Sequence, residues 1–249
     1  MTGREREGVE IRYFQKGFNY SQDGPGNRLV YHLCGCNMRC PWCSNPEGMD
    51  SGRGGRAEDV EAVAAAMLSA RAMFFDGGGV TLTGGECTMQ FEAVEALLQR
   101  LRAGGVNTCI ETNATHPRLE ALFPLLDTLI ADFKHPDDAL HRQWTGVGNG
   151  RVKQNLRAAA AHGLPVQLRV PLIHGVNDDD AALEGFVEFF ASLQRPGLSV
   201  EFLRYHEYGR EKWEKLGREY RMKDAFLPAG RAEAFERACA EAGIRIVRT

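Results

Sequence analysis

Short apolar segments alternate with amphipathic segments of helical period along this 249-residue chain, and this alternation limits the folds open to it. Segments with the character of strands lie at 29–34, 80–83, 108–112, 128–133, 166–173, 198–203 and 244–247. Helices are expected at 58–71, 91–102, 119–126, 152–161, 181–193 and 231–242. This order predicts a parallel sheet with right-handed crossovers. About six such units are fewer than the eight of a closed barrel, so we expect an α/β fold that is an open, partial TIM-like barrel.

Composition and charge exclude several classes of protein. Hydrophobic residues make up 43% and charged residues 25% of the chain, as in ordinary globular proteins. A net charge of −3 implies no general attraction to nucleic acid or to anionic membranes. No apolar run has the length of a membrane span, and the charged N-terminal segment lacks the apolar core of a signal peptide. We therefore expect a cytoplasmic protein in which residues 1–249 form a single domain, with a loop at 50–55.

Three of the seven cysteines are crowded together. Cys36, Cys40 and Cys43 form a CxxxCxxC pattern directly after the first predicted strand. An odd total with a dense cluster is typical of metal ligation in a reducing compartment rather than of a disulfide framework. Three such thiolates can bind three irons of a [4Fe–4S] cluster and leave the fourth iron without a protein ligand.

The triad alone leaves two other interpretations open. A structural zinc site would require a fourth ligand, and His32 and Cys34 lie nearby, although both fall on the predicted strand. Cys40 and Cys43 could also form a CxxC redox pair, but the thioredoxin-type sequence context is missing.

Other chemically distinctive residues follow the ends of the later strands. Because the carboxyl ends of parallel strands meet at one rim, we expect these residues to converge on one site. They are Gly84, Gly85, Glu86, Glu111, Thr112, Asp132, Lys134, Arg169 and His206. The two glycines allow a tight turn and close approach of the backbone to a ligand. Simpler roles remain open for others, such as a structural ion pair for Asp132 with Lys134 and a packed core position for His206.

The triad followed by the Gly-Gly-Glu sequence resembles the radical S-adenosylmethionine superfamily. The resemblance implies that the open iron of the cluster binds the amino and carboxylate groups of S-adenosylmethionine. Reduction of the cofactor would then yield a 5′-deoxyadenosyl radical. In such enzymes the cofactor carries the difficult chemistry, and the protein supplies binding and orientation.

A narrower resemblance covers nearly the whole chain. The Asp-Gly-Pro-Gly sequence that begins at Asp23, the Cys-Ser-Asn-Pro-Glu sequence at 43–47 and the segment 203–213 resemble the glycyl-radical-enzyme activating enzymes. This implies that the radical removes a hydrogen atom from a glycine of a partner enzyme, with flavodoxin or ferredoxin as the electron donor. Two alternatives stay open: a radical enzyme acting on a small molecule or another peptide, and a non-catalytic metal-binding module.

The same resemblance assigns roles residue by residue. Gly84, Gly85 and Glu86 would bind the methionine amino group, and Lys134 would contact the carboxylate. Arg169 and His206 would lie near the adenosine and methionine portions, and Asp23 near the target glycine loop of the partner. A monovalent cation site would comprise Glu111, Thr112 and Asp132, with Glu111 in a position where relatives carry aspartate.

One absence in the sequence bears on the number of clusters. Many relatives with the Cys-Ser-Asn-Pro-Glu sequence carry a cysteine-rich, ferredoxin-like insert before the Gly-Gly-Glu sequence. This chain has no cysteine between Cys43 and Gly84. We therefore predict a single cluster and no insert.

Overall fold

The predicted parallel strands are six consecutive strands, β2 and β4 to β8, of one eight-stranded sheet with the order β3-β1-β2-β4-β5-β6-β7-β8. The computed structural model describes residues 8–51, 54–193 and 196–249. Neighbouring strands from β2 to β8 are parallel, whereas β1 and β3 add antiparallel pairs at one edge. The strands are β1 (Glu10–Tyr20), β2 (Asn27–Leu33), β3 (Arg56–Asp59), β4 (Gly79–Gly84), β5 (Thr108–Thr112), β6 (Thr128–Asp132), β7 (Val166–Leu172) and β8 (Leu198–Arg204).

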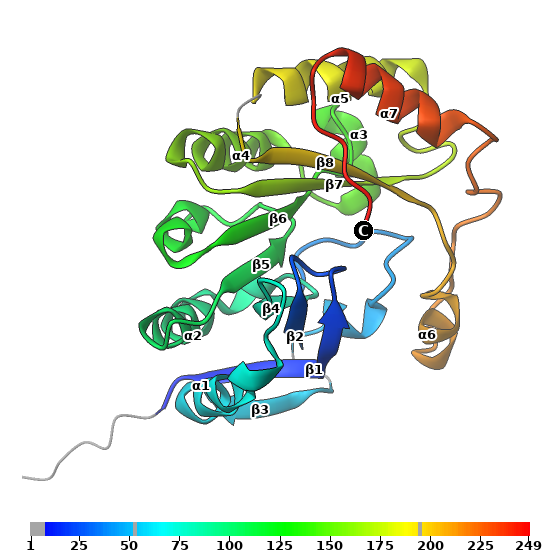
Figure 1. The fold of residues 1–249 in the computed structure, drawn as a ribbon. Coiled ribbons are helices and arrows are strands. Elements are labelled where there is room, and N and C mark those ends of the chain that lie inside the picture. The colour runs from blue at the N-terminus through cyan, green and yellow to red at the C-terminus, as the bar shows by residue number, and fades with distance from the viewer. Residues whose placement is uncertain (1–7, 52–53, 194–195) are drawn as a thin grey trace, which may run out of the picture.

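The sheet curves without closing, and helices cover its outer side (Figure 1). Six parallel strands with helical crossovers make the open partial barrel that the sequence predicted. The α-helices are α1 (Val60–Ser69), α2 (Phe91–Ala103), α3 (Asp138–Thr145), α4 (Gly150–His162), α5 (Asp180–Ser192), α6 (Arg210–Lys215) and α7 (Arg231–Glu241). Short 3-10 helices are η1 (Pro46–Met49), η2 (Ala70–Met73), η3 (Cys87–Gln90) and η4 (Leu119–Leu125).

Two predicted elements differ in type. The helix expected at 119–126 is the 3-10 segment η4, because Pro124 inside it cannot donate an α-helical hydrogen bond. The strand expected at 244–247 is a single parallel bridge between Val200 and Ile246. Of the loop expected at 50–55, residues 52 and 53 lie outside the described part of the chain.

Among the described strands and α-helices, four were not predicted: β1, β3, α3 and α6. The strands β1 and β3 lie at the edge of the sheet, and most of β1 is exposed, so their sequences lack the apolar runs of the inner strands. The helices α3 and α6 are short and polar, which weakens the periodic signal that sequence analysis depends on.

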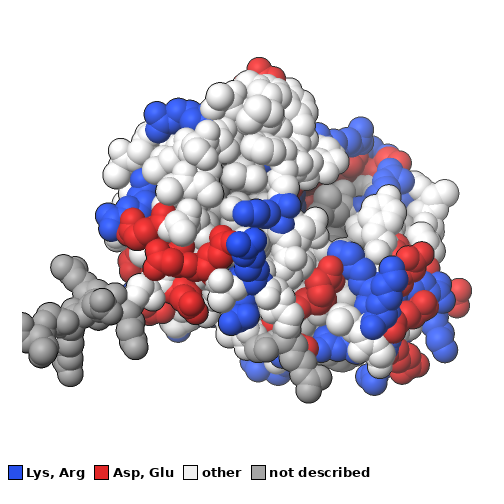
Figure 2. Space-filling model, turned by 90° about the horizontal axis from the view of Figure 1, so that it is seen from below, with Lys and Arg blue, Asp and Glu red and all other residues white. Residues whose placement is uncertain are grey.

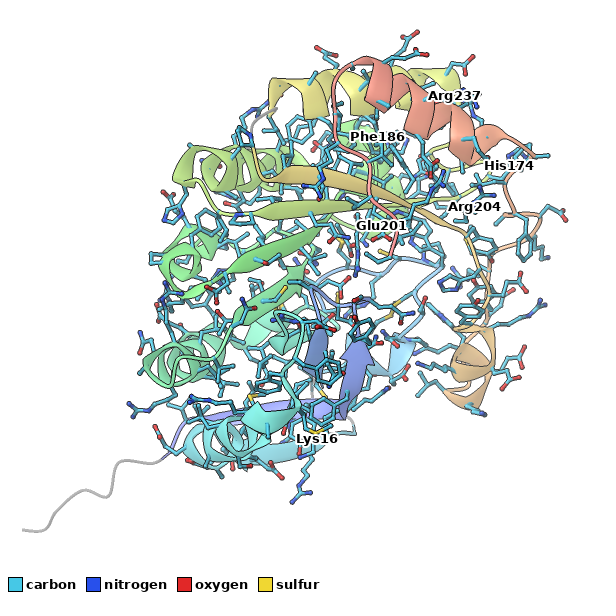
Figure 3. The ribbon with its side chains drawn as sticks, in the orientation of Figure 1. Lys16, His174, Phe186, Glu201, Arg204 and Arg237 are labelled. Carbon is cyan, nitrogen blue, oxygen red and sulfur yellow. The ribbon has the colours of Figure 1, made fainter. Side chains whose placement is uncertain are left out.

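The main core lies between the sheet and the outer helices. Phe186 of α5 is fully buried and packs edge-on against Phe202 of β8 and Phe235 of α7 (Figure 3). A second apolar cluster surrounds the cysteine loop and includes Met38 and Trp42. The second cluster places apolar side chains around the triad, so the loop is a packed part of the structure.

The surface charges are mixed in sign. Lys and Arg side chains lie among Asp and Glu side chains on the face shown in Figure 2. None of the described helices combines the length and the apolar character that crossing a bilayer requires.

Candidate active site

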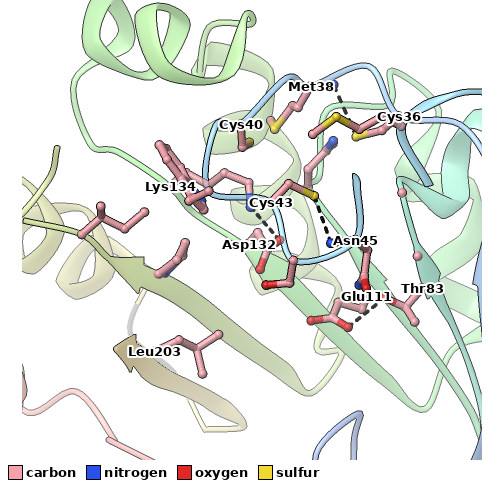
Figure 4. Close-up of a pocket in the computed structure, with 18 of the residues that line it drawn as sticks. Cys36, Met38, Cys40, Cys43, Asn45, Thr83, Glu111, Asp132, Lys134 and Leu203 are labelled. Atoms are coloured by element: carbon pink, nitrogen blue, oxygen red, sulfur yellow. Dashed lines mark hydrogen bonds and ion pairs between the residues drawn. The ribbon is translucent and has the colours of Figure 1, made fainter. Parts of the chain in front are cut away.

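A pocket opens at the carboxyl ends of the parallel strands, under the loop that follows β2 (Figure 4). Its volume is about 1050 Å³, which includes open solvent at the mouth. Chemically distinctive residues on its wall are Cys36, Cys40, Cys43, Gly84, Gly85, Glu111, Thr112, Asp132, Lys134 and His206. The structure thus brings together residues that are separated by up to six strands in the sequence, as the parallel topology requires.

The cysteine loop is held by backbone hydrogen bonds. Gly35 N–H donates to the Gly48 carbonyl oxygen at 2.8 Å, and Arg39 N–H donates to Thr145 at 2.8 Å. Within the loop, Met38 N–H donates to Cys36 Sγ and Asn45 N–H to Cys43 Sγ, each at 3.4 Å (Figure 4). Hydrogen bonds of this kind tune the sulfur ligands of iron–sulfur clusters.

The three cysteine thiols are largely buried from solvent. Burial raises the pKa of Cys36 to about 11 and that of Cys40 to about 12, and it also raises the pKa of Cys43. The nearby Lys134 ammonium acts in the opposite direction and favours the thiolates. Since thiolates are the form that binds metal, iron binding at these positions releases protons.

The arrangement fits a cluster better than a single zinc ion. Across the described residues, no three Cys, His, Asp or Glu side chains come close enough to share one metal ion. The three thiols instead line one wall of the pocket, where each can bind a different iron. His32 and Cys34, the candidate fourth ligands for zinc, are not on that wall.

The two glycines of the Gly-Gly-Glu sequence form part of the wall. Gly84 has φ +119°, in the region that favours glycine. A Cβ atom on Gly85 would collide with the carbonyl oxygens of Gly35 and Gly48 in the cysteine loop. These positions therefore let the strand end and the cysteine loop approach each other closely.

Unlike Gly84 and Gly85, Glu86 does not line the pocket, and its side chain is buried in the protein. It is 1% exposed and accepts hydrogen bonds from the Thr88 and Thr112 hydroxyls and from Asn113 N–H at 2.6 Å. Burial raises the pKa of Glu86, while these hydrogen bonds favour the carboxylate. The arrangement ties the end of β4 to the end of β5, and the carboxylate does not face the pocket.

Arg169 is also turned away from the pocket and joins two carboxylates. Its Nη1 donates to Glu111 Oε1 at 2.7 Å and its Nε donates to Glu201 Oε2 at 3.0 Å. A third bond reaches the Gln22 carbonyl oxygen in the β1–β2 loop. Burial opposes the charge on Arg169, but the two carboxylates outweigh it and raise its pKa. Arg169 therefore holds Glu111, which does line the pocket.

Lys134 and Asp132 form a partly buried ion pair on the wall, with Nζ 2.8 Å from Oδ2 (Figure 4). Burial alone would lower the pKa of Lys134, but Asp132 and the Cys40 thiolate raise it. Lys134 is thus a fixed positive charge between the thiols and the barrel interior.

The three residues of the expected cation site all line the pocket, but their oxygens already bind protein groups. Glu111 accepts from Thr83 at 2.8 Å and from Arg169, and Asp132 accepts from Lys134. The Thr112 hydroxyl donates to Glu86. Glu111 is one methylene longer than aspartate, which lets it reach Arg169 on β7. These bonds leave fewer lone pairs for a monovalent cation, so the cation site stays a prediction that binding experiments must test.

The remaining two predicted residues lie in different surroundings. His206 lines the pocket and stacks on Tyr208 with ring centroids 4.1 Å apart, and burial lowers its pKa. Asp23 lies in the β1–β2 loop, where its carbonyl oxygen accepts from the Thr81 hydroxyl at 2.6 Å. Asp23 is half-buried and does not line the pocket.

Several pocket residues were missed by sequence analysis. Met38, Ile173 and Tyr205 give the wall its apolar character, and Asn113 extends it next to Thr112. Trp213 donates its indole N–H to the Cys43 carbonyl oxygen at 2.9 Å from outside the pocket. Of these residues, Tyr205 and Trp213 carried a signal, since both lie in the segment 203–213 that resembles the activating enzymes.

Comparison with known proteins agrees with this geometry. The model of the Radical SAM superfamily matches residues 30–186. The chain is 32% identical to the pyruvate formate-lyase 1-activating enzyme of Escherichia coli K12 over 220 residues, which cover 86% of this chain and 88% of that protein. The chain belongs to the radical SAM superfamily.

Further relatives extend the match. The pyruvate formate-lyase-activating enzyme of Staphylococcus epidermidis is 34% identical over 83% of this chain and 85% of that protein. Among solved structures, a domain of pyruvate-formate lyase-activating enzyme from Bacteroides vulgatus superimposes with a TM-score of 0.57 at 24% identity, covering 68% of this chain and 98% of that domain. A radical SAM methyltransferase from Sphaerobacter thermophilus covers 98% of this chain and 74% of its own, with a TM-score of 0.65 at 19% identity. These two structures share the fold of this radical SAM protein.

Proposed function

We propose that this chain activates a glycyl radical enzyme by reductive cleavage of S-adenosylmethionine at a single [4Fe–4S] cluster. The observation that carries the proposal is the pocket itself. Three thiols, the cation of Lys134 and the open backbone at Gly84 and Gly85 face one cavity in a fold shared with radical SAM proteins. The identity of about one third to pyruvate formate-lyase activating enzymes, over most of both chains, selects the class of reaction.

Cys36, Cys40 and Cys43 would hold the cluster. Once bound, the cluster and S-adenosylmethionine supply one-electron reduction of the sulfonium, which releases methionine and a 5′-deoxyadenosyl radical that takes a hydrogen atom from the partner's glycine. Lys134 supplies a fixed positive charge for the cofactor carboxylate. The backbone of Gly84 and Gly85 lines the pocket without a side chain and would bind the methionine end of the cofactor.

Other residues act by holding the wall in shape. Glu86 joins the ends of β4 and β5 through Thr112 and Asn113. Arg169 orients Glu111 from the barrel interior. Apolar side chains such as Met38 and Ile173 exclude water, which favours a radical that must react only with its intended target.

The partner requirements follow from the site. A glycine in a protein must reach the pocket, so a loop of the glycyl radical enzyme would enter through the open mouth. His206, which lines the pocket, would lie near the adenosine and methionine portions of the cofactor. Asp23 would lie near that loop, as the resemblance implies. The electron comes from a flavodoxin or a ferredoxin.

Electron spin resonance tests the proposal directly. The reconstituted protein, reduced anaerobically with S-adenosylmethionine, is mixed with each candidate glycyl radical enzyme. A doublet from a glycyl radical, with stoichiometric 5′-deoxyadenosine, is the expected result. Formation of 5′-deoxyadenosine with a small molecule and no doublet with any partner would overturn it in favour of a small-molecule substrate.

A further inference from the structure

A second groove lies next to the cysteine loop and shares only Met49 with the pocket. Its walls come from the loop itself, through Arg39 and Pro41, and from the segment around α6, through Trp213, Arg218, Glu219 and Arg221. The three cysteines line the pocket together with Met38 and Trp42, whereas Arg39 and Pro41 line this groove. The two sides of one loop therefore serve two different cavities.

The groove is joined to the backbone of the cysteine loop by hydrogen bonds from both of its walls. Trp213, on its wall, donates its indole N–H to the Cys43 carbonyl oxygen at 2.9 Å. On the opposite wall, the Arg39 guanidinium donates to the carbonyl oxygens of Cys36 and, at 2.7 Å, of Met38. A molecule seated in this groove would contact groups bonded directly to the backbone of two of the three cysteines.

The charge of the groove is opposite to that of the whole chain. The net charge of the protein is −3, yet three arginines and one glutamate line the groove. Arg39 is exposed and, within the described part of the chain, forms no ion pair with a carboxylate. Arg218 pairs with Asp50 at 2.7 Å, and Arg221 pairs with Glu219 at 3.3 Å. The side chains of Arg221 and Glu219 are 77% and 72% exposed, so that pair is weak and can exchange.

The composition of the groove is that of a protein interface. Arg, Trp and Met are enriched at the centres of protein–protein interfaces, whereas Lys and Glu are depleted there. Arg39, Arg221, Trp213 and Met49 match this profile. Positive charge at such a surface steers an acidic partner and speeds its association.

We propose that this groove is the docking site of an acidic electron-transfer protein that reduces the cluster. The proposal rests on the function proposed above. In the step itself one electron leaves the reduced donor, which is oxidised by one electron, and enters the oxidised cluster, which is reduced by one. The substrate protein approaches through the pocket mouth, so electron donor and target glycine reach the cluster from different sides of the cysteine loop.

The test uses the reconstituted holoenzyme and reduced flavodoxin as the probe. Stopped-flow absorbance measures the second-order rate constant of cluster reduction for Arg221→Glu, Arg221→Gln and the matched control Arg237→Glu. Arg237 is exposed on α7, away from α6 (Figure 3), and its reversal changes the net charge by the same amount. Dithionite serves as the small reductant that needs no docking site.

At low ionic strength we expect the flavodoxin rate constant to fall about tenfold in Arg221→Glu and by a smaller factor in Arg221→Gln. The difference should shrink as salt is added. Arg237→Glu should stay within about twofold of the wild type, and dithionite should reduce all four proteins equally.

Equal slowing by Arg221→Glu and Arg237→Glu would overturn the proposal, because only the total charge would then matter. An unchanged rate in Arg221→Glu would also overturn it. Failure of the proposed function would give a different result from failure of the docking site. In that case the wild-type protein reduced by dithionite would form no 5′-deoxyadenosine from S-adenosylmethionine.

Discussion

Trp213 donates its indole N–H to the carbonyl oxygen of Cys43 at 2.9 Å, although the two residues are 170 positions apart in the chain. The bond fastens the segment after β8 to the loop that follows β2. Lys212 strengthens the same contact through Asn45 at 2.9 Å and Glu47 at 2.9 Å. The cysteine loop is therefore positioned from outside as well as by its own backbone.

Replacing Trp213 by phenylalanine should loosen this contact while keeping most of the ring. We expect the free energy of unfolding to fall by about 1 kcal/mol, the usual value of one hydrogen bond, and the cluster to be lost faster in air. Denaturant titration and the decay of the cluster absorbance measure the two effects. Trp144→Phe, which alters the ring next to Trp42, should leave cluster retention closer to the wild type. Equal retention in Trp213→Phe and wild type would contradict the expectation.

The cluster assignment can be tested by removing one thiol. Cys40→Ala should retain little iron and sulfide after reconstitution and should form no detectable 5′-deoxyadenosine, because a cluster iron loses its protein ligand. Cys239→Ala is the matched control, since Cys239 is a buried thiol on α7, outside the pocket. A full iron content in Cys40→Ala would show that the triad does not hold the cluster.

Arg169 is expected to stabilise the folded protein as well as to hold Glu111 at the pocket. Arg169→Met would leave the carboxylates of Glu111 and Glu201 without their common cation, which typically costs 3–5 kcal/mol for a buried pair, so we expect a loss of about that size. Urea unfolding of the apo protein measures it. Glu201→Gln removes one charge but keeps one oxygen that can accept from Arg169, and its amide nitrogen can donate to the Thr249 hydroxyl, so it should cost clearly less. A loss in Arg169→Met no larger than in Glu201→Gln would argue against the network.

Binding of S-adenosylmethionine should not depend on a monovalent cation. The oxygens of Glu111 and Asp132 already accept hydrogen bonds from Arg169, Thr83 and Lys134. We expect the same affinity in potassium chloride and in choline chloride, measured by titration of the holoenzyme. Glu111→Asp is one methylene shorter, loses its reach to Arg169, and should acquire a preference for potassium. A potassium requirement in the wild type would contradict this expectation.

His141 should make the apo protein sensitive to acid. The ring is fully buried, its Nδ1–H donates to the Val147 carbonyl oxygen at 2.6 Å, and burial lowers its pKa to about 4. In the unfolded chain His141 takes up a proton near pH 6.5, whereas in the folded protein it does so only near pH 4. The folded state therefore keeps its full stability above pH 6.5 and loses stability as the pH falls towards 4. The loss amounts to at most about 3 kcal/mol. Urea unfolding across this range should show it, and His141→Gln should have a flatter profile.

The sequence correctly predicted what depends on local pattern. Alternating apolar segments predicted six parallel strands and an open barrel, because strand and helix periods are properties of neighbouring residues. It missed β1, α3 and α6, whose sequences are polar or short, and it mistook η4 for an α-helix despite Pro124. Edge strands and short helices are stabilised by contacts with the rest of the fold, and these contacts leave little trace in local periodicity.

The same division applies to the site. By itself the sequence determined the chemistry available: the spacing of Cys36, Cys40 and Cys43, and the order of charged residues at strand ends. Only the tertiary structure decided which charges face the pocket. Glu86 and Arg169 turn away because Asn113 and Glu201, which lie on other elements, bind them there. The partners of a buried charge are set by distances across the sheet, and the low dielectric of the interior makes each such pairing costly to break.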